Sequence, residues 1–121
     1  MSRPRPLAFP LAAALAAAAL LGPAAGQAMS VTKLFGSVGP GSTISLKDAS
    51  GKKVKTLKPG KYAFVIKDQS SIHDFNLVGP GVNKTSGVGF VGTKTITVTL
   101  KKGSYKYQCS VHFFKGTFKV V

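Results

Sequence analysis

The chain has 121 residues, enough for one domain, and its charge is one-sided: 17 lysines and arginines stand against three acidic residues, a net charge of +14. No glutamate is present, so glycosidase-type carboxylate pairs and HExxH-type metalloprotease motifs are excluded. The many lysines could attract anionic partners. Alternatively, they only cover the exposed faces of the domain and protect its sheet edges. Nucleic acid is not an expected partner, because arginine is absent beyond Arg5 and no binding motif is recognisable.

Residues 1–28 have the layout of a secretory signal peptide. Two arginines form a basic head, LAFPLAAALAAAALLG follows as an apolar run, and PAAGQA closes it with small residues. The alternative is an uncleaved membrane anchor, but the run is shorter than the roughly 20 residues of a spanning helix and contains Pro10. We expect cleavage near Ala28, a mature domain of residues 29–121, a periplasmic or extracellular location, and no stable membrane insertion afterwards.

Beyond this leader, short segments with a period near two alternate with turns, which predicts β-strands. In chain order the segments are STISLKD, KYAFVIKD, IHDFNLV, TKTITVTL, SYKYQC and TFKVV. Turns are predicted at GPGS, KPGKY, GPGVNKTSG and KKGS. No amphipathic segment is long enough to predict a helix. The sequence therefore predicts an all-β fold, a Greek-key β-sandwich or barrel.

The alternation within these segments predicts which side chains face the core. TITVTL shows the pattern, since its apolar residues alternate with threonines that face outward; the inward residues are Ile96, Val98 and Leu100. In IHDFNLV the same parity turns His73 inward and Asp74 away from it. In SYKYQCS it turns Cys109, the only cysteine, inward as well.

The only two histidines and the only cysteine fall where one site could use all three. His112 lies in the loop just after the strand of Cys109, and His73 comes from a distant strand. A thiolate with two imidazoles is the ligand set of a blue-copper centre, although each residue taken singly is more often core packing. Zinc would need a fourth ligand that is not evident, and a Cys–His nucleophilic pair would lack a group to orient its base. We expect a metal site and no enzymatic activity.

These residues carry a resemblance to a known family. SSIHDFNLVGPGVNKTSGVG, followed by TITVTLKKGSYKYQCSVH and KGTFKVV, resembles the plastocyanin, amicyanin and pseudoazurin group of cupredoxins, over roughly residues 61–121. The resemblance implies an eight-stranded Greek-key sandwich with one type 1 copper ion bound by His73, Cys109 and His112. It also implies a mobile one-electron carrier whose exposed ligand histidine provides the electron route within an apolar docking patch.

One element of the family pattern is absent. Family members place an axial methionine two to four residues after the downstream histidine, and HFFKGTF contains none. Three outcomes follow as alternatives. In the first, three strong ligands bind copper, Phe113 or Phe114 lies near the axial position, and the reduction potential is raised. In the second, the carbonyl oxygen of Ile72 supplies a weak axial contact. In the third, the shortened loop moves His112 off the metal.

The lysine-rich surface indicates which partners the protein would bind. Without the leader, fifteen lysines stand against three aspartates, a net charge of +12. We expect a monomeric electron carrier that meets redox partner proteins through an acidic docking face on the partner, with salt-sensitive association. The alternative is a copper-handling protein, or a cupredoxin-fold interaction module with a degenerate metal site.

Overall fold

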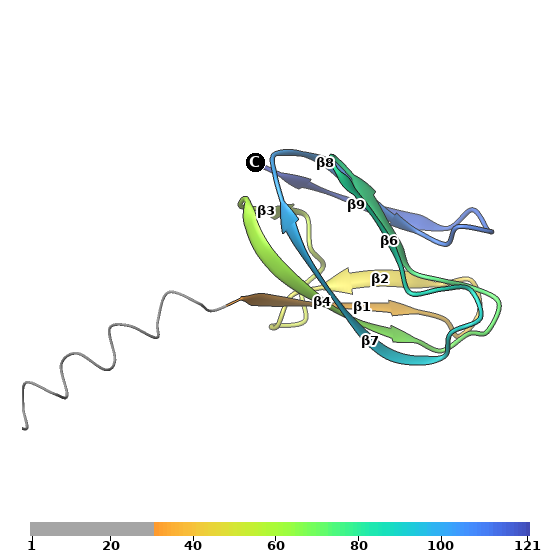
Figure 1. Cartoon of the computed structure of the whole chain (residues 1–121). Helices are drawn as coiled ribbons and strands as arrows, with labels where there is room; N and C mark the ends of the chain where they lie inside the picture. Colours follow the sequence, from red (N-terminus) through yellow and green to blue (C-terminus); the bar gives the residue numbers. More distant parts are fainter. Residues whose placement is uncertain (1–30) are drawn as a thin grey trace, which may run out of the picture. The chain divides into compact units, whose positions relative to one another are not determined.

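Nine β-strands and no helix make up the part of the chain that the computed structural model describes, Val31–Val121 (Figure 1). The all-β prediction is confirmed, with nine strands in place of about eight. The predicted signal peptide, residues 1–28, lies outside the described residues. In residues 31–121 no helix is long and apolar enough to cross a membrane.

The first sheet contains four strands in the order β2-β1-β4-β7. In chain order they are Thr32–Val38 (β1), Ile44–Lys47 (β2), Gly60–Asp68 (β4) and Gly92–Leu100 (β7). β1 pairs antiparallel with β2 and parallel with β4, and β4 pairs antiparallel with β7 along its whole length. The threonines of β7 are exposed while Val98 and Leu100 are buried, as the alternation predicted.

The second sheet contains five strands in the order β3-β9-β8-β5-β6. In chain order they are Thr56–Leu57 (β3), Asn76–Gly79 (β5), Val82–Thr85 (β6), Gly103–Gln108 (β8) and Lys115–Val120 (β9). β3 pairs parallel with β9, and the other pairs are antiparallel. The chain crosses between the sheets after β2, β3, β4, β6 and β7, which gives the interleaved connections of a sandwich.

Two predicted boundaries were wrong. Residues 82–85 were assigned to a turn because they contain an asparagine and follow Gly-Pro-Gly, yet they form β6, paired with β5. The segment 72–78 was assigned to one strand, yet its strand begins only at Asn76. Asp74 is therefore not on an exposed strand face opposite His73; both residues are buried, at 1% and 4% exposure.

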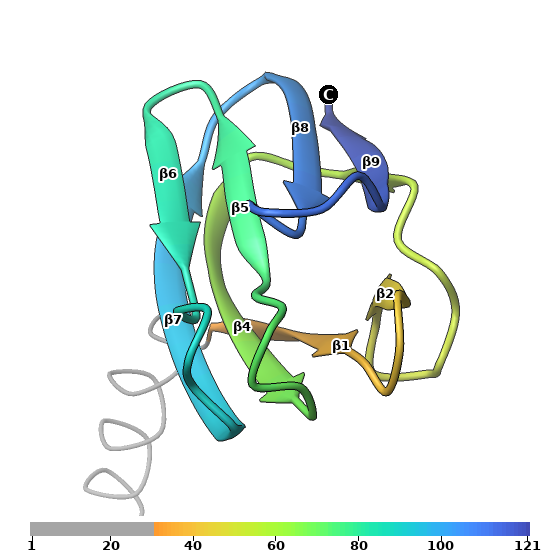
Figure 2. The same cartoon turned by 90° about the vertical axis from the view of Figure 1, so that its right-hand side faces the viewer.

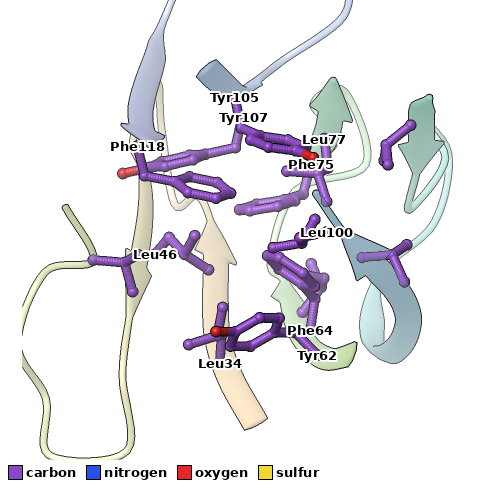
Figure 3. Packing of buried hydrophobic residues seen from close by; sticks show 14 of the residues in the cluster. Leu34, Leu46, Tyr62, Phe64, Phe75, Leu77, Leu100, Tyr105, Tyr107 and Phe118 are labelled. Carbon is purple, nitrogen blue, oxygen red and sulfur yellow. The ribbon is translucent and has the colours of Figure 1, made fainter. Parts of the chain in front are cut away.

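The core lies between the two sheets (Figure 3). Leucine and phenylalanine side chains from the four-stranded sheet face an aromatic layer from the five-stranded sheet. Phe75, which directly precedes β5, stacks on Tyr107 at 5.5 Å between ring centroids, and Tyr105 stacks on Phe118 at 5.2 Å. At the sides of the sandwich, β6 approaches β7 and β2 approaches β9 (Figure 2).

Four connecting segments gather at one end of the sandwich. The register pairs the end of β1 with the end of β4 and the start of β7, and pairs the start of β5 with the ends of β6 and β8. The segments at this end are therefore residues 39–43, 69–75, 86–91 and 109–114. His73, Cys109 and His112 all lie in them.

Candidate metal centre

His73 is positioned by a buried polar network that holds Phe75, two residues further along the chain. The backbone N–H of Phe75 donates to the hydroxyl of Ser86 at 2.9 Å, and the N–H of Ser86 donates back to the carbonyl oxygen of Phe75 at 3.0 Å. The Ser86 hydroxyl also donates to the carboxylate of Asp68 at the end of β4, at 3.2 Å. Because Ser86 is 1% exposed, these bonds are shielded from water and anchor the segment that carries His73.

Cys109 and His112 lie in a tight loop between β8 and β9. The N–H of Cys109 donates to the carbonyl oxygen of Phe114 at 3.2 Å, which closes the loop at its base. Cys109 is 2% exposed, as the alternation of β8 predicted, and His112 is exposed. The thiol thus comes from the core and the second imidazole from the surface.

Asp74 ties the two ligand-bearing loops together. Its carboxylate accepts hydrogen bonds from the N–H of Ser110 at 2.6 Å, from the Ser110 hydroxyl at 2.9 Å, and from the hydroxyl of Thr85. Burial acts to raise the pKa of Asp74, but the hydrogen bonds from Thr85 and Ser110 outweigh it and lower the pKa below its ordinary value. A charged carboxylate therefore fixes the residue after His73 to the residue after Cys109.

The three predicted ligand residues meet at one point. Nδ1 of His73 lies 3.0 Å from Nδ1 of His112, and Sγ of Cys109 lies 3.6 Å from each of these nitrogens. The three donor atoms form a nearly symmetric triangle in which no carboxylate takes part. The structure thus brings together the whole set that the sequence predicted, including His112, which lies beside the other two.

This triangle has the dimensions of a metal site. A point equidistant from the three atoms lies about 2.0 Å from each, which matches metal–nitrogen distances of about 2.0–2.1 Å and is within a few tenths of an ångström of metal–sulfur distances. When one histidine carries a proton on Nδ1, the 3.0 Å separation is also a hydrogen bond. The residues could therefore hold a metal ion with little rearrangement.

Phe114 packs beside the site. Its ring lies edge-on to His73, at 4.9 Å and 87°, and roughly parallel to His112, at 6.4 Å and 18°. It is partly buried against the core, whereas Phe113 is fully exposed. Of the two phenylalanines proposed for the axial region, the structure places Phe114 beside both imidazoles and turns Phe113 to solvent.

The end of the sandwich around His112 also exposes apolar side chains. Four of the exposed large hydrophobic residues lie in its loops: Ile72, Val91, Val111 and Phe113. A scattered exposed apolar residue is ordinary, but four in the loops of one end make that end an apolar surface with His112 among them.

Comparisons of the chain with protein-family models, with curated proteins and with solved structures found no match. Sequence reasoning missed the supporting group of Asp74, Thr85, Ser86 and Ser110. The only signal for it was the position of Asp74 and Ser110, each directly after a predicted ligand.

Proposed function

We propose that this protein is an exported, copper-binding cupredoxin that carries one electron at a time through a type 1 site without an axial methionine. The observation that supports it most is the convergence of one thiol and two imidazole nitrogens, from loops about 36 residues apart in sequence, within 3.6 Å of one another. The resemblance of residues 61–121 to small cupredoxins supports the same proposal.

The donor set favours copper over zinc. A structural zinc site usually takes four protein ligands, and the group in residues 31–121 has three. A soft thiolate with two imidazoles in a trigonal arrangement suits copper, which supplies one-electron redox chemistry when bound. Cys109 would provide the thiolate, His73 the buried imidazole, and His112 an imidazole that reaches the surface.

The surroundings of the three ligands suit electron transfer rather than substrate turnover. Asp74, Ser110 and the bond from Cys109 to Phe114 hold both loops in place, so the ligand geometry is set by the protein before any ion binds. Phe114 packs beside both imidazoles and against the core. Residues 31–121 contain no methionine whose thioether could stabilise the oxidised ion, and we expect a raised reduction potential.

Partner recognition would combine the apolar end with the lysine-rich surface. His112 lies among the exposed apolar residues, which suits close approach of a redox partner. The net positive charge would steer an acidic partner toward the protein and make association weaken as salt is added.

Copper addition to the purified protein tests the proposal. One equivalent of Cu(II) should give an intense thiolate-to-copper absorption in the visible range and an EPR spectrum with narrow copper hyperfine splitting. Cys109→Ser should abolish both signals while leaving the fold intact by circular dichroism. A protein that stays colourless with copper, or that binds copper without the thiolate band, would contradict the electron-carrier proposal.

A copper-handling role is the second candidate, and the exposure of His112 favours it, since an accessible ligand can pass an ion to another protein. The two functions differ in one measurement. A carrier keeps its copper through repeated reduction and oxidation, whereas a copper-handling protein releases Cu(I) to a competing chelator after one reduction.

A further inference from the structure

The hydroxyl of Tyr107 is buried without a hydrogen-bond partner in the described part of the protein. Tyr107 is 1% exposed. The other two tyrosines bond their hydroxyls locally, Tyr62 to the carbonyl oxygen of Lys58 at 2.6 Å and Tyr105 to that of Lys101 at 2.8 Å. A buried hydroxyl with no partner costs free energy, so its position calls for a partner from outside residues 31–121.

Gly116 lets this hydroxyl reach a hollow at the side of the sandwich. A Cβ at residue 116 would lie 2.3 Å from the Tyr107 hydroxyl oxygen, so no larger residue fits there. Tyr107 and Gly116 both line a hollow of about 180 Å³ between β2 and the start of β9, and Ser45 of β2 lines it as well. This is the side at which β2 and β9 approach each other (Figure 2).

Three lysines line the same hollow: Lys47 from β2, Lys53 from the segment after it, and Lys115 from β9. Lys47 and Lys53 are held next to each other by an isolated β-bridge. No carboxylate lines the hollow, and the three aspartates accept their hydrogen bonds from hydroxyls and backbone amides elsewhere. Like charges around one concavity repel each other and concentrate a positive potential there.

We propose that this hollow binds a phosphate-type oxyanion, with the three lysines supplying the charge and the Tyr107 hydroxyl donating a hydrogen bond. A tetrahedral oxyanion accepts several hydrogen bonds at once and brings more than one negative charge. The volume of about 180 Å³ admits one such group with a few waters. Its lining comes from β2, β8, β9 and the segment after β2, while the metal ligands come from the loops at the end of the sandwich.

The phosphate could be free or part of a larger molecule. A second hollow of about 710 Å³ shares Lys53 with the first and is lined by three further lysines, Lys55, Lys106 and Lys119. The remainder of a phosphate-bearing molecule would lie over this hollow.

Titration of the full-length protein with inorganic phosphate, against sodium chloride at matched ionic strength, tests the site. Backbone amide NMR shifts should change at the three lysines, Tyr107 and Gly116 and saturate. Lys53→Gln and Lys115→Gln should each bind phosphate roughly tenfold more weakly, because each loses a charged hydrogen-bond donor. Lys33→Gln, on β1, should bind as the wild type. Equal weakening by Lys33→Gln, or shifts spread evenly over the lysines, would overturn the proposal.

Tyr107→Phe provides a second test that separates binding from folding. Without phosphate this variant should be as stable as the wild type or more stable, because the removed hydroxyl has no partner within residues 31–121. Its affinity for phosphate should fall severalfold. Unchanged phosphate affinity would overturn the role of Tyr107. Glycerol phosphate run in parallel distinguishes the source: binding equal to inorganic phosphate indicates a free ion, and tighter binding indicates a larger phosphate-bearing molecule.

Discussion

At the scale of single residues, the candidate metal centre depends on side chains that are not themselves candidate ligands. Asp74 is one residue from His73 and bonds to the residue after Cys109, so one carboxylate determines the separation of two ligands. Phe114 fills the space beside both imidazoles. Substitutions at these two positions should therefore affect folding as well as the site.

Asp74→Asn should lower the free energy of unfolding of the metal-free protein by about 2 kcal/mol at pH 7, because hydrogen bonds to a buried charged carboxylate are lost. The pKa of Asp74 is lower in the folded protein than its ordinary value of 3.8. Its contribution is therefore complete above the ordinary value and disappears as the pH falls through the folded value. Urea unfolding of wild type and variant from pH 7 down to pH 2 should show the two curves converging in acid.

Asp48→Asn is the matched control for this experiment. Asp48 accepts its bonds in an exposed turn, from Ser50 and Lys52, away from the candidate metal centre. It should change stability less than Asp74→Asn at pH 7. An equal effect of the two variants would contradict a special role for Asp74.

Phe114→Ala should reduce the free energy of unfolding by roughly 2 kcal/mol, less than a fully buried phenylalanine, because the ring is only partly buried. Phe113→Ala removes a ring that is fully exposed and should stay within about 0.5 kcal/mol of the wild type. Chemical denaturation of the metal-free variants measures both. Similar losses for the two variants would show that Phe114 does not pack as described.

At the scale of strands, the alternation in the sequence was most informative where one face of a strand packs on the core. β7 and β8 are such strands, and the inward direction of Cys109 followed directly from the parity of β8. The prediction that His73 faces inward was correct, but strand parity was an incomplete reason for it. His73 lies in a loop and is positioned by Ser86 and Asp74. Hydrogen bonds between distant loops leave no periodic signal.

Three other strands were not predicted from the sequence, for physical reasons. β6 has one buried residue, Val82, and its remaining positions are exposed and polar, so it looked like part of a turn. β3 has only two residues. β1 contains Gly36, whose missing side chain makes room for Ile66 and Phe75 and weakens the strand pattern. Local composition predicts such segments poorly because their pairing partners decide them.

Gly79→Ala tests the packing between β5 and β8. A Cβ at this position would lie 2.1 Å from the ring of Tyr105, whose hydroxyl is tied to Lys101 and whose ring stacks on Phe118. Because the ring cannot move freely, the substitution should overpack the core and lower the free energy of unfolding by roughly 2–3 kcal/mol. Gly89→Ala, at a position with open space, should leave the midpoint of urea unfolding unchanged or slightly raised. A neutral Gly79→Ala would mean that the Tyr105 ring has freedom to shift.

At the scale of the whole molecule, the charge distribution is the dominant feature. Two of the three aspartates are buried, and all three accept bonds from hydroxyls or backbone amides. The lysines therefore have few carboxylates to neutralise them, and the folded state brings fifteen positive charges into a small volume. Self-repulsion of this kind opposes the compact state and is weakened by dissolved ions.

Sodium chloride should therefore stabilise this protein. Raising its concentration from about 10 mM to about 300 mM shortens the screening distance from roughly 30 Å to less than 10 Å, so repulsion between separate lysine clusters is largely removed. The unfolded chain is expanded and gains less from screening, and Tm measured by circular dichroism at pH 7 should rise by a few degrees. Lys101→Gln combined with Lys102→Gln, which removes two neighbouring exposed charges, should raise Tm at low salt and reduce the gain from added salt. A fall of Tm with sodium chloride would show that attractive ion pairs outweigh the repulsion among the lysines.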